Sequence, residues 1–171
     1  MKTLKFLPLL AGLLFNASLF AAQDHLTDSQ ILQTVKTVNN GEISLAQLAQ
    51  RSENADVRNF AKMMIDHHKK SNNEMLDLEK KLHLKPNTSK TSKNLQEEAN
   101  DTKKDLQRAS GTEFNSKYIA SQVDMHGKVL DLLDSKLIPA ASDSELKTAL
   151  NKVRSTVSEH LSEAKKIQSQ L

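Results

Sequence analysis

Residues 142–171 read SDSELKTALNKVRSTVSEHLSEAKKIQSQL, and apolar side chains recur in them at alternating steps of three and four. That spacing puts these side chains on one face of an α-helix, as on the buried side of a bundle helix. The first four residues, Ser142 to Glu145, have the spacing of a capping box, which starts a helix. The segment therefore predicts a long amphipathic helix whose buried face holds Leu146, Leu150, Val153, Val157, His160, Ala164, Ile167 and Leu171.

Three earlier segments carry the same pattern. The first begins at Thr27, again with the spacing of a capping box. The second is capped by Asn54 and runs to about Leu82, and the third is capped by Thr112 and stops at Pro139. The sequence thus predicts three further long helices, each with one apolar face.

A shorter helix is predicted from about Lys93 to Ala109, after a loop over residues 83–92. Leu, Ala, Lys, Gln and Glu dominate the composition, aromatic residues make up only 4%, and there is no Trp or Cys. This composition favours helix throughout, and without cysteine the fold must rest on packing alone. We therefore predict an all-α protein, an antiparallel four-helix bundle with a short extra crossover helix.

Each long helix places a polar residue among its apolar positions. These residues are Glu42 on the first helix, His67 on the second, His126 on the third and His160 on the last. On the second helix, His68 projects about 100° away from His67, so periodicity leaves open which of the two points inward. Gly41 beside Glu42 weakens its helix and indicates close approach by a neighbour or a local bulge.

The four polar residues are predicted to meet at mid-height. Glu42 and His67 lie 12 and 13 residues from the break between the first two helices. His126 lies 13 residues before the proline that ends the third helix, and His160 lies 18 residues after the start of the last. With a rise of about 1.5 Å per residue, three of the four are level and the fourth is about one turn away.

Buried carboxylates and imidazoles need partners, either one another or an ion. Three histidines and one glutamate suit one transition metal ion, namely zinc, copper or iron. A di-iron centre in a bundle normally uses Glu-x-x-His spacings, and none occurs in the sequence. We therefore predict a metal site of Glu42, His67, His126 and His160, with a hydrogen-bond network as the alternative.

Copper is a separate possibility, because Met63, Met64, Met75 and Met125 lie near the histidines in sequence and thioethers suit cuprous copper. Methionine at helical spacing more often fills a core. Residues 64–68 with Met75 also look locally like a copper-associated family of small exported helical proteins. We predict no catalytic residues, since no phosphate loop or nucleophile elbow is visible.

Residues 1–22 have the layout of a secretory signal peptide, with Lys2 and Lys5 before an apolar run and small residues at Ala21 and Ala22. The run is shorter than the roughly 20 apolar residues that span a bilayer, so no transmembrane segment is expected after cleavage. Cleavage leaves a single domain over residues 23–171 and lowers the net charge from +3 to +1, because two lysines and no acid are lost. A nearly neutral exported protein is not expected to bind nucleic acid.

Four stretches of the chain resemble the exported bacterial family called domain of unknown function 4142. They are Gly41 to Ala46, Phe60 to His67, Glu113-Phe114 with Tyr118 and His126, and Glu159 to Leu161. By this resemblance His67, rather than His68, is the histidine of the family pattern.

The resemblance implies a ferritin-like bundle in the periplasm or envelope of a Gram-negative bacterium. Members are often labelled outer membrane proteins, and no activity is established for them. Asp66 and Tyr118 would orient the imidazoles, with His68 as an alternate to His67. The expected function is a metal-binding protein, or else a structural or stress-related envelope protein with no ion.

Overall fold

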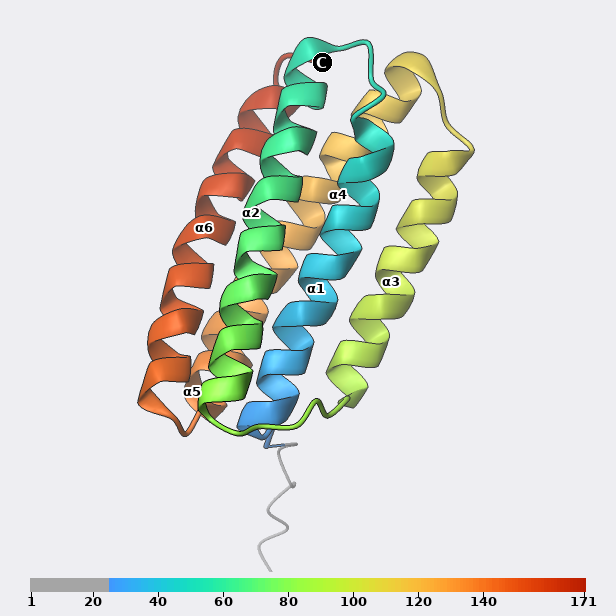
Figure 1. Cartoon of the computed structure of the whole chain (residues 1–171). Coiled ribbons are helices and arrows are strands. Elements are labelled where there is room, and N and C mark those ends of the chain that lie inside the picture. Colours follow the sequence, from blue (N-terminus) through green and yellow to red (C-terminus); the bar gives the residue numbers. More distant parts are fainter. Residues whose placement is uncertain (1–24) are drawn as a thin grey trace, which may run out of the picture.

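The computed structural model describes residues 25–171 and consists of helices joined by short connections. The predicted signal peptide and its cleavage site lie outside these residues. In the described part, five long helices run alternately up and down, which confirms the all-α antiparallel bundle (Figure 1). They are α1 (Asp28–Ala49), α2 (Ala55–Lys81), α3 (Lys90–Gln107), α4 (Gly111–Leu132) and α6 (Ser144–Gln168).

Four of the five long helices start at a side-chain cap. The exception is α4, which starts after Ser110 rather than at the expected Thr112 and has no side-chain hydrogen bond to its first turn. The predicted capping box at Thr27 and the Asn54 cap are both present, each satisfying backbone N–H groups that the first turn leaves free. The crossover helix begins three residues earlier than expected, because Ser89 forms a capping box with Ser92. For α6 the cap is Asp143 rather than the expected Ser142.

The end of α4 differs from the prediction. Pro139 does not stop the helix; a π-turn over Leu133–Leu137 leads into the short α5 (Ile138–Ala140), which contains the proline. In an α-helix the ring of Pro139 would press on the carbonyl four residues earlier and leave it without a donor. The wider π-turn relieves this conflict, so the chain stays helical for one more turn.

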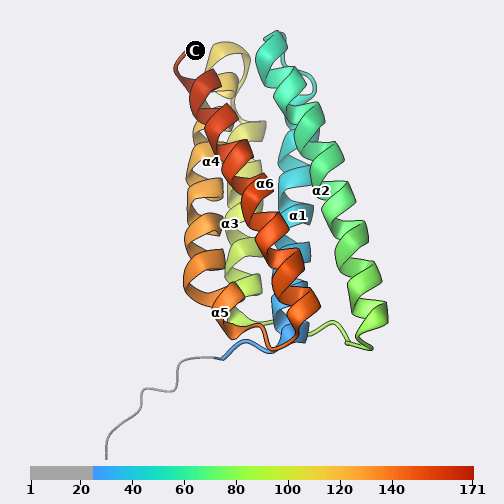
Figure 2. The ribbon, with the colours of Figure 1, turned by 90° about the vertical axis from the view of Figure 1, so that its left-hand side faces the viewer.

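The crossover helix α3 packs along the side of α1 that faces away from α2 (Figure 1). The two helices come close at Gly41, where an added Cβ would lie 2.9 Å from Ala99 Cβ. The predicted close approach by a neighbour is therefore confirmed, and Gly41 is the residue that permits it. Viewed from the side, α4 and α6 form a second packed pair, beside α1 and α2 (Figure 2).

The apolar core is divided into two parts. One cluster, including Leu45, Phe60 and Ile119, lies toward the turn between α1 and α2. The other, including Ile31 and Leu146, lies toward the opposite end of the bundle. Buried polar side chains from all four long core helices fall between them, namely Asn39, Glu42, His68, Gln122, His126 and His160. Within residues 25–171, no helix is long and apolar enough to cross a membrane.

Candidate metal centre

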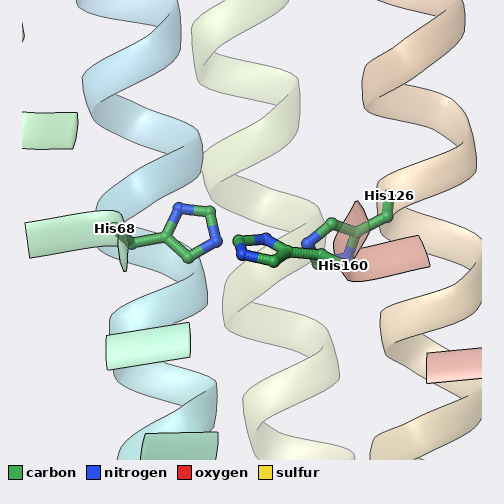
Figure 3. Close-up of side chains that lie close together, drawn as sticks. All are labelled: His68, His126 and His160. Atoms are coloured by element: carbon green, nitrogen blue, oxygen red, sulfur yellow. The ribbon is translucent and has the colours of Figure 1, made fainter. Parts of the chain in front are cut away.

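Three buried histidines from three helices converge at mid-height of the bundle. They are His68 of α2, His126 of α4 and His160 of α6, and their side chains point toward one another (Figure 3). One ring nitrogen from each lies within 4.8 Å of the others. All three residues are at most 4% exposed. We refer to them below as the histidine trio.

Each ring of the trio has one nitrogen already occupied by a hydrogen bond. His68 Nδ1 lies 2.8 Å from Asn39 Oδ1, and His126 Nδ1 lies 2.8 Å from the carbonyl oxygen of Gln122. His160 Nε2 lies 2.9 Å from Nδ1 of His67. The hydrogen bonds therefore anchor one side of every ring.

The partners also determine where the protons sit. A carbonyl oxygen only accepts, so Nδ1 of His68 and of His126 must carry the hydrogen and donate it. Neutral imidazole has one such hydrogen, which leaves Nε2 of both rings with a free lone pair. For His160 the partner is the imidazole of His67, so the direction of the hydrogen bond depends on the tautomers: Nδ1 of His160 has the free lone pair when its Nε2 donates to His67 Nδ1.

The remaining three nitrogens have no partner in the protein. His68 Nε2, His126 Nε2 and His160 Nδ1 are all buried without a hydrogen bond. An unsatisfied buried polar atom costs about 1–3 kcal/mol, and native proteins hold few of them. Three such atoms, on rings that point toward one another, are candidate metal ligands.

Burial keeps His68 and His160 neutral. Desolvation lowers the pKa of His68 well below its ordinary value of 6.5, and the neighbouring His160, His126 and His67 lower it further. Desolvation, followed by His126 and His67, lowers the pKa of His160 to about 3. At neutral pH these two imidazoles therefore need to lose no proton before they bind a cation.

Glu42, the predicted fourth ligand, lies behind His126 rather than among the converging nitrogens. Its Oε1 lies 3.9 Å from His126 Nδ1, the side of the ring that faces away from the free lone pair. Gln122 Nε2 donates to Glu42 Oε2 at 2.9 Å. Burial raises the pKa of Glu42, although His126 and the Gln122 hydrogen bond lower it. Glu42 is thus a buried countercharge beside the trio.

Of the two residues expected to orient the imidazoles, one lies on the surface and the other in the interior. Asp66 is exposed. Tyr118 is fully buried one turn before Gln122, and its hydroxyl has no partner. Burial, and then the nearby Glu42 carboxylate, raise the pKa of the Tyr118 phenol well above 10.0. Tyr118 therefore lies beside Glu42, at one end of the buried polar residues that separate the two apolar clusters.

On α2 the structure turns His68 inward, and His67 is exposed. The trio therefore contains His68 where the predicted set has His67. The physical reason is the rotation of α2: Met64, Ile65, His68 and Met75 are buried together, and His67 falls at the edge of that face. His67 keeps a role, because it supplies the nitrogen that holds His160.

Asn39 is the residue that sequence reasoning missed. It is buried, accepts from His68, and its amide nitrogen donates to Ser71 and to Asn72, each at 3.0 Å. These donations fix which way the amide points. The available signal was its spacing, four residues after Val35 and three before Glu42, which places Asn39 at a core position.

Comparison with curated proteins and with solved structures finds no significant match. Comparison with protein families matches residues 16–167 to the domain of unknown function DUF4142. The match spans α1 to α6 and nearly the whole of the described helical bundle. The chain belongs to the family called domain of unknown function 4142.

Proposed function

We propose that this protein binds one divalent first-row transition metal ion through the histidine trio. The ligand atoms are His68 Nε2, His126 Nε2 and His160 Nδ1. The observation that carries the proposal is that these three nitrogens are buried and unpartnered on three rings that point toward one another, while the other nitrogen of each ring is hydrogen-bonded. Metal-binding histidines in proteins typically have this division of roles.

The donor set favours borderline ions such as zinc or cobalt. Nitrogen ligands of a tetrahedral zinc ion lie roughly 3.3 Å apart, given Zn–N bonds of about 2.0–2.1 Å. One ring nitrogen from each residue of the trio lies within 4.8 Å of the others, so the rings would have to approach by up to about 1.5 Å to reach that spacing. Glu42, when ionised, has one negative charge close to the trio, which would offset part of the charge of a divalent ion.

The methionines give copper less support. Met64 and Met75 are fully buried in the two apolar clusters, and Met63 and Met125 pack against the first cluster. That placement is the usual core-filling role of methionine. A soft site for cuprous copper is therefore the second candidate for the ion, behind a histidine-bound divalent ion.

The rival function is a structural envelope protein in which the same residues form only a hydrogen-bond network. Such a network accounts for Asn39 and His67 and for the side-chain nitrogen of Gln122, whereas the side-chain oxygen of Gln122 has no partner. It leaves the three inner nitrogens unsatisfied. Those three nitrogens favour metal binding over the network.

The test is metal titration of untagged, metal-free protein. Zinc and cobalt are added in competition with a chromophoric chelator, and we expect one equivalent of either ion to bind. Single changes His68→Ala, His126→Ala and His160→Ala should each lower the affinity by about 100-fold, since each removes a ligand. The matched control is His25→Ala, because His25 is exposed and outside the helices.

The His67→Ala variant tests whether the metal ligand from α2 is His68, as the structure indicates, or His67, as the sequence predicts. If His67 is the ligand and His68 is not, His67→Ala should abolish binding and His68→Ala should spare it. We expect the reverse order of severity. Equal metal content in the wild type and in all three trio variants would exclude the site.

We also propose that the protein is exported to the periplasm or envelope, where its bundle would be ferritin-like in architecture but without a di-iron centre. The support is the signal-peptide layout of residues 1–22. Mass measurement of the protein recovered from the periplasm should give a chain that begins near residue 22 or 23. A full-length chain found only in the cytoplasm would contradict export.

A further inference from the structure

An apolar cavity of about 340 Å³ lies next to the histidine trio. Its walls include Val35, Val129, Leu133 and Val153, contributed by α1, α4, the π-turn and α6. The pocket is partly open to solvent, and ligand pockets in proteins begin at about 300 Å³. The volume of this pocket is therefore large enough to hold a small ligand.

The polar end of the cavity belongs to the trio. His68 and His160 both line the cavity, and so does Asn39, while exposed Lys70, Glu74, Lys152 and Glu159 lie among its outer residues, so the mouth itself carries no net charge. Each of the two histidines has an inner nitrogen without a partner. An ion held between them would lie at the inner end of an apolar pocket.

The net charge of the ion and its ligands then determines which molecules such a pocket would bind. Imidazole binds a metal ion as a neutral ligand, and Glu42, whose Oε1 lies 3.9 Å from His126 Nδ1, contributes at most one negative charge, so a divalent ion keeps an excess positive charge in a buried site. Three ligands also leave the fourth position of a tetrahedral ion open, as in catalytic rather than structural zinc sites. Both features favour an anionic oxygen donor as the fourth ligand.

We propose that the cavity binds a small monoanionic amphiphile, a carboxylate or phenolate with a compact apolar body. Its oxygen occupies the open position on the ion, and its apolar body lies against Val153 and the facing valines and leucines. The proposal rests on the metal site proposed above, and it adds the class of molecule that the site recognises.

The experiment uses the cobalt-loaded protein, because the visible spectrum of cobalt reports its coordination. Benzoate, its neutral counterpart benzamide, and acetate, which lacks the apolar body, are titrated separately. We expect a saturable spectral change with benzoate, about tenfold weaker binding of acetate because it buries less apolar surface, and no change with benzamide.

Cavity-filling variants supply the structural check. Val153→Phe should weaken benzoate binding by about tenfold or more, because the added ring takes the space of the ligand, while cobalt affinity stays unchanged. Leu132→Phe, which fills the cavity from α4, should act alike if Val153→Phe folds poorly. The control is Ser155→Phe, an exposed residue of α6 outside the cavity.

The outcomes separate the two proposals. Failure of the wild type to bind cobalt would overturn the metal site and this inference together. Cobalt binding with no response to benzoate would overturn the inference alone. Equal affinity for benzoate and acetate, or full benzoate binding in both cavity-filling variants, would also overturn it, because the apolar cavity would then have no part in recognition.

Discussion

At the scale of single residues, Asn39 decides which nitrogen of His68 faces the interior. Its side-chain oxygen accepts from His68 Nδ1, and its nitrogen is occupied by Ser71 and Asn72. The amide therefore cannot rotate without losing several hydrogen bonds. This constraint holds the lone pair of His68 Nε2 toward the rest of the trio.

Replacing Asn39 should weaken metal binding without removing a ligand. We expect Asn39→Ala to lower zinc affinity by about 10- to 100-fold, the usual effect of losing a group that orients a metal-bound histidine. Asn40→Ala is the control, since Asn40 is exposed and bonds only Asn72. Chelator competition measures both. Equal affinities in the two variants would show that Asn39 does not orient the ring.

The neutral histidines also predict how the stability of the metal-free protein depends on pH. His68 and His160 have pKa values lowered from 6.5, mainly by desolvation, to about 3 for His160. Below pH 6.5 His68 and His160 become protonated in the unfolded chain, whereas in the folded protein both stay neutral. Stability is therefore full above pH 6.5 and falls as the pH drops toward 3, by up to about 1.4 kcal/mol per pH unit for each histidine.

Glu42 has the opposite effect, so the test compares variants. Because its pKa is raised from 4.5, protonation of Glu42 as the pH falls removes the cost of burying its charge. We expect the melting temperature of the metal-free wild type to decline from pH 6.5 to 4.5, and the double variant H68Q/H160Q to flatten that decline. Parallel profiles in the two proteins would contradict the burial of these imidazoles as neutral rings.

At the scale of helices, the contact between α1 and α3 depends on one glycine. An added Cβ at Gly41 would lie 2.9 Å from Ala99 Cβ, and neither atom can swing away. Alanine would improve helix propensity by about 1 kcal/mol, but overpacking of this kind costs about 1–3 kcal/mol. The cost of overpacking should therefore exceed the gain in helix propensity.

We therefore expect Gly41→Ala to lower the free energy of unfolding by about 1–2 kcal/mol in urea denaturation. The double variant G41A/A99G should recover part of this loss, because it removes the opposing methyl group. Gly127→Ala is the matched control, since an added Cβ there meets nothing within 4 Å. It should be neutral or raise stability by up to about 1 kcal/mol. A destabilised Gly127→Ala with a tolerated Gly41→Ala would reverse this interpretation.

Helix positions were predictable because they depend on local chemistry. The caps at Thr27 and Asn54, and the apolar period between them, are properties of a few neighbouring residues. The π-turn before Pro139 was not predictable in this way. Pro139 has no backbone N–H to donate, but a continued helix keeps Leu133 and Leu137 packed in the core. That packing depends on helices that are distant in the sequence.

The site was predicted only in part, for a related reason. His126 and His160 are central in their apolar stripes, so periodicity places both inside. His67 and His68 flank the margin of the α2 stripe, where a rotation of the helix by less than a third of a turn decides which one is buried. That rotation is set by packing across the bundle, which the sequence of α2 alone does not contain.

At the scale of the whole molecule, a polar layer separates two apolar clusters. The layer contains the histidine trio and their partners from α1, α2, α4 and α6. Without an ion, three nitrogens in this layer are unsatisfied at the centre of the bundle. Apolar side chains there would pack more stably, so the layer is consistent with selection for binding rather than for stability.

An ion bound by the trio would join α2, α4 and α6 at mid-height, and this predicts a global effect on stability. Zinc should raise the melting temperature, because a ligand that binds only the folded state stabilises it by about 2.7 kcal/mol at 100 times its dissociation constant. For a domain of this size that corresponds to roughly 5–10 °C. Calorimetry with and without zinc measures the shift, and His126→Ala should abolish it. An equal shift in His126→Ala would mean that zinc acts at exposed side chains and that the interior trio does not bind it.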